Sequence, residues 1–453
     1  MSIRTSGSAI PGSSIKEVYD DCDQIYPQVL ENARRIIRSA QQAIAARIQT
    51  NGGVLVFNPH SFPCSSTVRV NGETCFAQNI PPLGYAVVAP KHSDGSIQVQ
   101  QYSAENRYFR LHFDAHYNLM SIFDKEAQRE VLDLSKGLGN QLEAYEDFPR
   151  DYDAWEITNY YKEKRYLVND VTEAEAVHDG VRAGIRIRRK FLTSEIVQTI
   201  WLYEDIKKID FETTIDWKQE HLLLKAAFPV SINSNRATYE IQFGTIERPT
   251  HSNTSWDAAK FEVCAHKYCD YSEYGYGVAL MNDCKYGHDV HDGVMRLTLL
   301  KSATYPNPDA DRCMHAFTYS LAPHIGDYRE TGIVQMAYDL NQQMEAIPVN
   351  QQAGTLADSY SLAQVSEANV ILETVKKSES GDALIFRLYD AYNEHRENVE
   401  ITFGFDASHA YLCSMMEEDL QELSLCERSV HLTVKPFEIV TLKVYPNDKG
   451  EAQ

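Results

Sequence analysis

Apolar residues recur with helical spacing over the first fifty positions of the chain. The i, i+3, i+4, i+7 pattern begins at Ser14 and Glu17, which fit a capping box, and it continues on both sides of Pro27. The pattern predicts one long amphipathic helix, or two helices that meet at Pro27. No other strong helical stretch is present in the sequence to bury the apolar stripe. We therefore interpret residues 1–50 as the remnant of a helical bundle whose other helices lie elsewhere.

From position 54 the apolar period changes to two, which is typical of β-strands. Short alternating segments recur without intervening helices, and Asn71-Gly72 is a strong hairpin signal. This pattern predicts a mainly β fold built from stacked antiparallel sheets. We expect four regions along the chain. They are the helical bundle remnant at 1–50, a small β segment at 51–98, a large antiparallel β-sandwich at 99–350 and a smaller C-terminal β-sandwich at 351–453.

The composition limits which classes of partner the protein can bind and which cellular compartment it can occupy. The net charge of −21 argues against nucleic acid or an anionic membrane as the main partner. The nine cysteines contain no CxxC pair, which favours free thiols in a reducing compartment. The N-terminus has no apolar leader, and no apolar run approaches the length needed to span a membrane. We therefore expect a cytoplasmic protein.

Residues 147–156, called the acidic loop below, carry the most informative chemistry of the chain. Four carboxylates and two aromatic residues beyond Pro149 share this short segment with one basic residue, Arg150. Crowded carboxylates repel one another unless a ligand, a cation or a partner uses them. Aromatic rings beside carboxylates suit a sugar, whose C–H faces stack on the rings while its hydroxyls donate to the acids. A solvated acidic loop is the alternative interpretation.

A second polar segment, residues 247–257, contains Arg248, His251 and Trp256 in one stretch. Such runs after a proline are often ordinary loops. A loop tryptophan, however, needs a core or a ligand to cover it. Together with the acidic loop, this segment predicts a carbohydrate-facing rim.

Two other groups of residues have the chemistry of metal ligands but not the spacing. His288 and His291 flank Asp289 between glycines, which we interpret as a turn between strands rather than a metal site. Cys264 and Cys269 bracket His266, but no second half of a zinc site accompanies them. We interpret these cysteines as packed thiols in or beside a strand.

Several ordered stretches identify a family resemblance. The chain resembles the C-terminal half of a glycoside hydrolase family 38 α-mannosidase, of the cytosolic and vacuolar branch that trims free mannose oligosaccharides. The similarity covers nearly all of residues 10–445, with a local departure at Glu156, where that branch more usually has Asp. The matching stretches are residues 10–19, 51–58, 121–125, 151–155, 237–244, 248–257 and 279–287.

The resemblance implies a galactose mutarotase-like supersandwich for the large β region, and it also implies what the chain lacks. In this family an N-terminal domain carries the nucleophilic Asp, the general acid and most ligands of a catalytic zinc. The family's histidine ligand before Pro11 is replaced here by residues 7–10, which read Gly-Ser-Ala-Ile. Retaining glycosidases need two carboxylates about 5 Å apart, and no metal site accompanies the acidic loop. We therefore expect no catalytic residue, metal ligand or cofactor in this chain, although the parent enzyme would bind zinc or another divalent metal.

The role that the resemblance implies is support of a catalytic domain and formation of one wall of a mannose pocket. The expected partners are that N-terminal domain and a mannose-containing oligosaccharide, with self-association as a further possibility. A stand-alone carbohydrate-binding sandwich and an oligomerisation module are the alternatives. The candidate sugar-binding residues are Asp151, Asp153, Trp155, Tyr145, Asp147, Arg248, His251 and Trp256.

Overall fold

The computed structural model describes residues 14–447, and strands dominate it. The expectation of a mainly β fold is confirmed. Residues 7–10 and the start of the first family-like stretch lie outside the described residues. The chain divides into two compact units, which are described separately below. Unit 1 comprises Met1–Arg35, Ser93–Glu240 and Ile246–Asn341, and unit 2 comprises Ile36–His92, Ile241–Thr245 and Gln342–Gln453.

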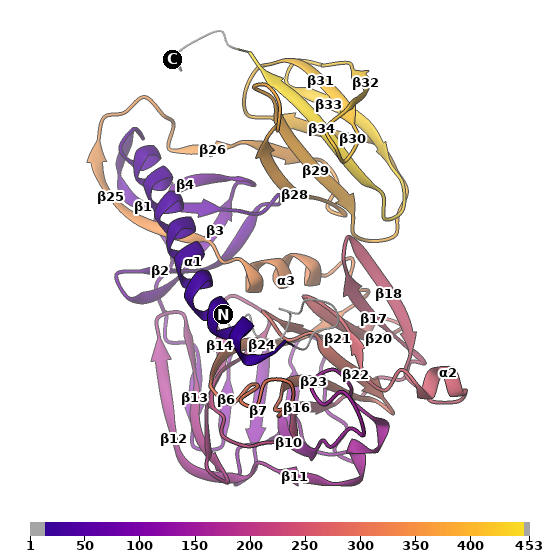
Figure 1. The fold of residues 1–453 in the computed structure, drawn as a ribbon. Coiled ribbons are helices and arrows are strands. Elements are labelled where there is room, and N and C mark those ends of the chain that lie inside the picture. Colours follow the sequence, from indigo (N-terminus) through magenta and orange to yellow (C-terminus); the bar gives the residue numbers. More distant parts are fainter. Residues whose placement is uncertain (1–13, 448–453) are drawn as a thin grey trace. The chain divides into compact units, whose positions relative to one another are not determined.

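One continuous helix, α1 (Lys16–Ala45), forms the N-terminal part of the described chain (Figure 1). Pro27 lies inside this helix, so the structure has one helix where the sequence left open one or two. The apolar stripe that the periodicity predicts remains exposed, including Ile25, Val29 and Ile36. None of the helices in residues 14–447 has the length and apolar character needed to cross a membrane.

Within residues 14–447, three short helical segments lie among the strands. The segment η2 (Asn159–Glu163) follows the acidic loop, and α2 (Ser255–Ala258) lies within the second polar segment. The helix α3 (Ile333–Asn341) buries Ile333, Val334 and Leu340. The sequence pattern missed α3, because nine residues give too few turns for a clear helical period.

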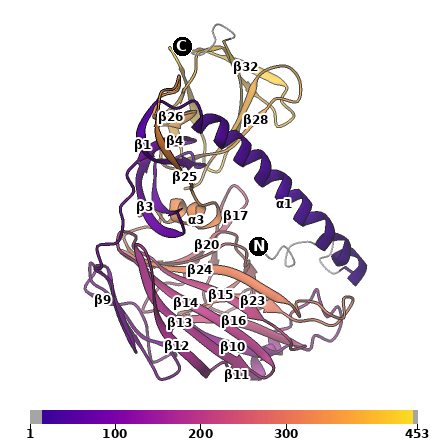
Figure 2. The ribbon, with the colours of Figure 1, turned by 90° about the vertical axis from the view of Figure 1, so that its left-hand side faces the viewer.

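Unit 1 contains a nine-stranded and a six-stranded antiparallel sheet, together with a small five-stranded sheet. Figure 2 shows the long strands β12 to β15 and β24 of the largest sheet. In spatial order the nine strands are β12 (Asp170–Asp179), β13 (Arg182–Phe191), β14 (Ser194–Tyr203), β15 (Ile209–Asp216), β24 (Met314–Ile325), β21 (Tyr276–Asn282), β20 (Tyr268–Glu273), β17 (Arg236–Ile241) and β18 (Gly244–Pro249). The six are β11 (Arg165–Leu167), β10 (Gln141–Glu146), β16 (Leu222–Pro229), β23 (Val294–Lys301), β22 (Gly287–His291) and β19 (Val263–Cys264). The five are β5 (Gln98–Gln100), β6 (Ser103–Glu105), β7 (Phe109–Phe113), β8 (Leu119–Asp124) and β9 (Arg129–Glu130).

Unit 2 contains four smaller sheets with separate cores. Those of the C-terminal part, drawn from orange to yellow in Figure 1, enclose a core that includes Phe386, Phe403 and Leu442. One sheet has the order β25 (Glu345–Gln352), β1 (Thr50–Asn58), β4 (Gly84–Val88) and β26 (Ser359–Ser361), and a hairpin pairs β2 (Cys64–Val70) with β3 (Glu73–Ile80). The others are β27 (Ala363–Val365), β30 (Arg396–Phe403) and β33 (Ser429–Val434), then β28 (Val370–Lys377), β29 (Leu384–Asp390), β34 (Ile439–Pro446), β31 (Ala407–Cys413) and β32 (Asp419–Leu423).

The six-stranded sheet has two chemically different faces because successive side chains point to opposite sides of a strand. Leu142, Leu224 and Leu297 point into the main core of unit 1. Next to them in sequence, Glu143, Lys225 and Arg296 are charged and lie on the other face, and the strand register brings Glu143 opposite Lys225. All eight residues of β16 are buried, so both faces of its central part are covered. The charged face therefore lies within the protein rather than in solvent.

Candidate functional site

The acidic loop follows β10 and is fixed at two of its carboxylates. Asp147 is only 2 % exposed, and its carboxylate pairs with the Lys301 ammonium at the end of β23. Burial raises the pKa of Asp147, and the Lys301 charge opposes that rise. Asp153 accepts a hydrogen bond from the Thr304 backbone N–H at 2.7 Å, and its other oxygen lies 3.6 Å from His221 Nδ1. These two acids hold the loop against the neighbouring segments.

The remaining side chains of the acidic loop form its outer surface. Trp155 is 56 % exposed and contacts Tyr152 edge to face, with ring centroids 5.5 Å apart. Phe148 is also exposed and stacks on the His221 ring at 4.5 Å. Asp151 points into solvent, 3.9 Å from the Arg150 guanidinium. The loop thus presents aromatic faces beside an exposed carboxylate, which are the groups expected of a sugar-binding surface.

Tyr145 lies on β10, inside the protein. Its hydroxyl donates to Glu143 at 2.5 Å, and its ring meets Tyr161 edge to face at 5.1 Å. Burial, reinforced by the Glu143 charge, raises the pKa of Tyr145 to about 12. Tyr145 and Asp147 are therefore buried among protein partners, and their contact with a sugar stays a prediction.

The second polar segment connects β18 to β19. Contacts of its Arg248 and His251 side chains hold it at the protein surface. The Arg248 guanidinium lies over the Tyr239 ring at 4.7 Å and donates to the Cys264 carbonyl at 3.1 Å. His251 Nδ1 is 3.8 Å from the Asp257 carboxylate. Trp256 is 81 % exposed. A tryptophan this open suits an interaction surface.

The two segments leave the six-stranded sheet at different places. The acidic loop follows β10, whereas the second segment leads into the edge strand β19, and β16, β23 and β22 lie between these two strands. The combined rim that the sequence suggests stays a prediction, because the two segments attach to strands that are not neighbours.

A buried charge network covers the polar face of the sheet between these segments. The Lys225 ammonium contacts the carboxylates of Glu262 and Asp289, the latter at 2.5 Å. Arg296 joins Asp289 at 3.1 Å to Glu143 at 3.2 Å. Burial alone would lower the pKa of Lys225, but Asp289 and Glu262 outweigh it and raise that pKa well above its ordinary value. The network is closed on itself and holds the sheet face together.

His288 and Asp289 lie on strand β22, so their interpretation as part of a turn is wrong. The glycine at 293 makes the turn after the strand, with a positive φ of 78°. Within residues 14–447, the groupings of His, Cys, Asp and Glu close enough to share a metal ion include no residue of the acidic loop. Its acids, two of which have protein partners, do not fit a zinc site.

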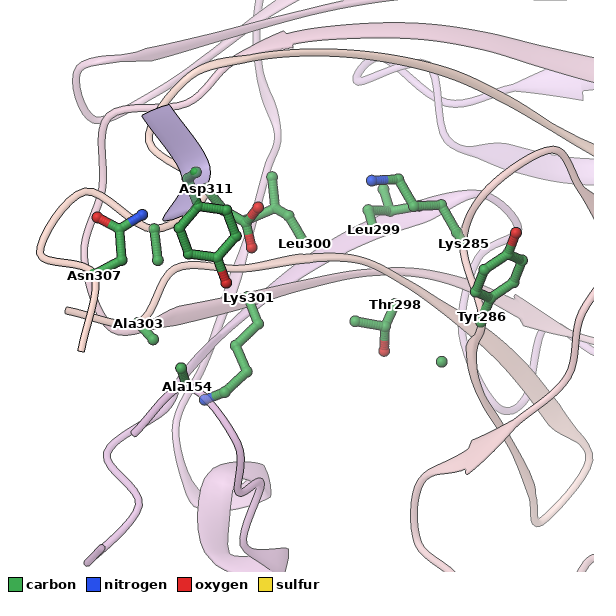
Figure 3. A pocket seen from close by; sticks show the side chains of 13 residues that line it. Ala154, Lys285, Tyr286, Thr298, Leu299, Leu300, Lys301, Ala303, Asn307 and Asp311 are labelled. Atoms are coloured by element: carbon green, nitrogen blue, oxygen red, sulfur yellow. The ribbon is translucent and has the colours of Figure 1, made fainter. Parts of the chain in front are cut away.

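A cavity of about 230 Å³ in unit 1 lies beside the acidic loop (Figure 3). Ala154 of that loop lines it together with Lys301 and Leu300 of β23, so the pairs that fix the loop also shape the cavity. Lys285 enters from the turn between β21 and β22, and Asp311 from the segment after β23. The other lining residues are Tyr19, Tyr286, Gly287, Thr298, Leu299, Ala303, Asn307 and Ala310.

Three residues of this site were not singled out from the sequence. Lys301 and His221 have no local motif, because their partners Asp147 and Asp153 lie far away in sequence. Lys285 lies in the family-like stretch 279–287, which was the one available signal. Its burial beside a cavity depends on the packing of the sheet and could not be predicted from the stretch itself.

Comparison with known proteins places the chain in a family. Residues 104–309 match the model of the glycosyl hydrolases family 38 C-terminal domain, and residues 369–442 match that of the family 38 C-terminal β-sandwich domain. Human alpha-mannosidase 2C1 is 32 % identical over 96 % of this chain and 44 % of its own length. Alpha-mannosidase G of Dictyostelium discoideum is 28 % identical over 97 % of this chain and 47 % of its own length.

The structural comparison agrees with these matches. The crystal structure of an alpha-mannosidase from Enterococcus faecalis V583 has the same fold, with a TM-score of 0.78 over 95 % of this chain and 61 % of that one, at 15 % identity. The chain spans less than half the length of the curated relatives named above. It belongs to glycoside hydrolase family 38 and carries the C-terminal domains of that family.

Proposed function

We propose that this chain is the supporting C-terminal part of an α-mannosidase that releases terminal α-linked mannose from oligosaccharides. In this proposal the chain docks against a catalytic N-terminal domain and supplies one wall of the mannose site. The observation that carries the proposal is the match of both C-terminal family domains in a chain that aligns with 44 % of alpha-mannosidase 2C1.

The acidic loop is the part of that wall with the best-suited chemistry. Asp147 and Asp153 fix the loop, while Trp155, Tyr152 and Asp151 face outward. A rigid loop that presents aromatic rings and a carboxylate binds a sugar without a large cost of ordering on binding. A neutral oligosaccharide also carries no charge for the strongly acidic chain to repel.

Helix α1 supports the docking to another domain. Its exposed side chains include Ile25, Val29 and Ile36, at helical spacing. An apolar stripe on a helix is stabilised by burial against another helix or sheet. A bundle completed by the N-terminal domain is the occupant we propose for this surface.

Hydrolysis itself is assigned to the catalytic domain. A retaining glycosidase uses two carboxylates about 5 Å apart on either side of the scissile bond. In the acidic loop, Asp147 is paired with Lys301 and Asp153 is bonded to Thr304, so neither is placed as a nucleophile. The catalytic metal, zinc or another divalent ion, is likewise proposed to bind the other domain. We propose the cytoplasm as the compartment, as the free thiols suggest.

Reconstitution tests this proposal. The N-terminal part of a full-length relative such as alpha-mannosidase 2C1 is produced separately and mixed with this chain. We expect p-nitrophenyl α-mannoside hydrolysis by the mixture but by neither part alone, together with a complex on gel filtration. Hydrolysis by this chain alone would contradict the proposal, and so would a complex that stays inactive.

A stand-alone carbohydrate-binding module is the second candidate, and the outward-facing rings of the acidic loop favour it. Such a module would bind mannose oligosaccharides with undiminished affinity in the absence of any catalytic domain. An oligomerisation module would instead give self-association that is independent of both sugar and catalytic domain. Calorimetry and light scattering on the isolated chain separate these outcomes.

A further inference from the structure

Three side chains with the chemistry of metal ligands meet in unit 2, at the start of strand β3 (Figure 1). The Cys75 thiol, the Glu73 carboxylate and the His92 imidazole each offer one ligand atom, and these atoms all lie within 4.8 Å of one another. None of the three belongs to the acidic loop or to the second polar segment. Sulfur and nitrogen ligands favour zinc, whereas magnesium and calcium prefer oxygen.

The strand register brings the three side chains to one face. Glu73 and Cys75 are two residues apart on β3, so their side chains point to the same side of the strand. Phe76 and Lys91 exchange both backbone hydrogen bonds, at 2.9 and 2.8 Å. Continuing this antiparallel register by one residue places His92 opposite Cys75, in the more closely spaced type of pair. The backbone therefore holds the thiol and the imidazole together before any ion binds.

The spacing of the ligand atoms fits a tetrahedral ion. Cys75 Sγ lies 3.5 Å from His92 Nδ1, and that nitrogen lies 3.5 Å from a Glu73 carboxylate oxygen. An ion about 2.3 Å from sulfur and about 2.0–2.2 Å from nitrogen and oxygen separates neighbouring tetrahedral ligands by about 3.4–3.6 Å. Two of the three edges thus have the length that such an ion requires. The fourth position is left to water, as in zinc sites with three protein ligands.

The buried thiol is reached through the two exposed ligands. Cys75 is fully buried, but the imidazole that lies directly against its sulfur belongs to a side chain that is 64 % exposed. The Glu73 side chain is 49 % exposed. Exposed side chains change rotamer on the picosecond to nanosecond time scale. An ion that binds first to the carboxylate and the imidazole therefore reaches the sulfur without any movement of the strands.

A similar pair elsewhere in unit 2 shows what the thiol adds. His409 Nδ1 lies 3.0 Å from a Glu422 carboxylate oxygen, and both side chains are exposed. Within residues 14–447, this pair belongs to neither of the groups of three close ligands. Exposed ion pairs of this kind are ordinary surface contacts. The reduced thiol of Cys75 is what turns a surface pair into a set of three different ligands.

We propose that Glu73, Cys75 and His92 form a binding site for Zn²⁺ or a similar divalent ion, with the sulfur bound as a thiolate. The thiol proton passes to solvent as the metal–sulfur bond forms. The bound ion connects β3 to the segment after β4 and stabilises this part of unit 2. The site differs from our expectation of a chain without metal ligands, because positions 73, 75 and 92 follow none of the usual zinc spacings. The inference does not rest on the proposed function.

Titration of the full chain with Co²⁺ as a probe for Zn²⁺ tests the proposal. A cobalt–thiolate bond gives a charge-transfer absorption band that carboxylate and imidazole ligands alone do not give. We expect this band in the wild type, and we expect Zn²⁺ to abolish it. Cys75→Ser should remove the band, and His92→Gln should lower the Co²⁺ affinity at least about tenfold, because even changes behind metal ligands cost about 10- to 100-fold.

His409→Gln is the matched control, since it removes an exposed histidine that pairs with a carboxylate but has no thiol beside it. The control should bind Co²⁺ like the wild type. Equal melting temperatures of metal-free wild type and His92→Gln exclude misfolding as the cause of lost affinity.

Two results would overturn the site. The first is a wild type without the band, or a band of unchanged strength and affinity in Cys75→Ser or His92→Gln. The second is displacement of Co²⁺ by Mg²⁺ as readily as by Zn²⁺, which would indicate a surface site made of carboxylates alone. Since no catalytic domain takes part, failure of this test leaves the reconstitution test unaffected, and the reverse also holds.

Discussion

Two buried lysines of unit 1, Lys225 and Lys285, differ in what surrounds their charges. Lys225 is fully buried and contacts the carboxylates of Glu262 and Asp289. Lys285 is 1 % exposed, lines a cavity and has an aromatic ring as its protein contact. The pKa values diverge accordingly, because carboxylates raise that of Lys225 while burial lowers that of Lys285.

The comparison separates a buried charge that stabilises the fold from one that does not. Both residues are lysines and both are buried, so burial alone does not distinguish them. In a closed network such as that of Lys225, the ammonium donates to protein carboxylates and so helps to hold the fold together. A buried ammonium without an acceptor, such as that of Lys285, instead costs stability.

The largest expected effect comes from breaking the closed network. Lys225→Met leaves Glu262 and Asp289 buried without their cation, so we expect a loss of about 3–5 kcal/mol in the free energy of unfolding. Urea denaturation measures it. The triple variant Lys225→Met, Glu262→Gln, Asp289→Asn should recover part of this loss. A loss under about 1 kcal/mol in the single variant would show that the network is weak.

The buried His288, next to Asp289 of the same network, should make the stability of the protein depend on pH. Burial, reinforced by the Lys225 charge, lowers the pKa of His288 to about 3, against an unfolded value of about 6.5. Its contribution to stability is therefore complete above about pH 6.5 and is lost as the pH falls toward 3. Between pH 7 and 4 the wild type should lose about 3 kcal/mol more than His288→Gln does. Parallel pH profiles of the two proteins would contradict this assignment.

A third lysine, Lys301, provides an intermediate case because it is paired with one buried carboxylate. Asp147→Asn weakens that pair and should cost about 1–3 kcal/mol while loosening the acidic loop. Trypsin cleavage after the exposed Arg150 reports the loosening directly, and we expect it to become faster. Glu156→Gln, at an exposed position of the same loop, is the control and should leave the cleavage rate unchanged. Equal cleavage of Asp147→Asn and wild type would show that Asp147 does not fix the loop.

The smallest effect is expected at Lys285. Lys285→Met removes a buried charge that has no acceptor, so stability should change by less than about 1 kcal/mol or rise slightly. Measured beside Lys225→Met under the same conditions, it tests the comparison itself. A loss as large as that of Lys225→Met would mean that Lys285 is also a structural charge.

The strands of the core could be predicted well from the sequence because they alternate or are continuously apolar. Examples are β16 (Leu222–Pro229), which is buried along its whole length, and β14 (Ser194–Tyr203). The turn expected around His288 is instead a strand. Its polar residues lie on the charged face of the sheet, where Asp289 pairs with Lys225 and Arg296. Polar residues in a strand mimic a turn when their partners are distant in sequence.

The sequence shows that the acidic loop is rich in carboxylates and aromatic residues. It does not show which of these carboxylates are buried and which are exposed. Nothing local distinguishes Asp147 from Asp151, yet the first is buried against Lys301 and the second is exposed. The distinction comes from the packing of β10 beside β16 and β23, which brings residues about 150 positions apart into contact. Long-range pairing of this kind leaves no trace in local periodicity.

We propose that the acidic loop forms a wall of a mannoside site once a catalytic domain is present. The most direct test compares p-nitrophenyl α-mannoside hydrolysis by the reconstituted mixture containing wild-type chain or Trp155→Ala. We predict restored turnover with the wild type and about five- to twelvefold lower kcat/KM with Trp155→Ala, because lost stacking costs about 1–1.5 kcal/mol, with complex formation unchanged. Equal kcat/KM for the two mixtures would contradict the claim.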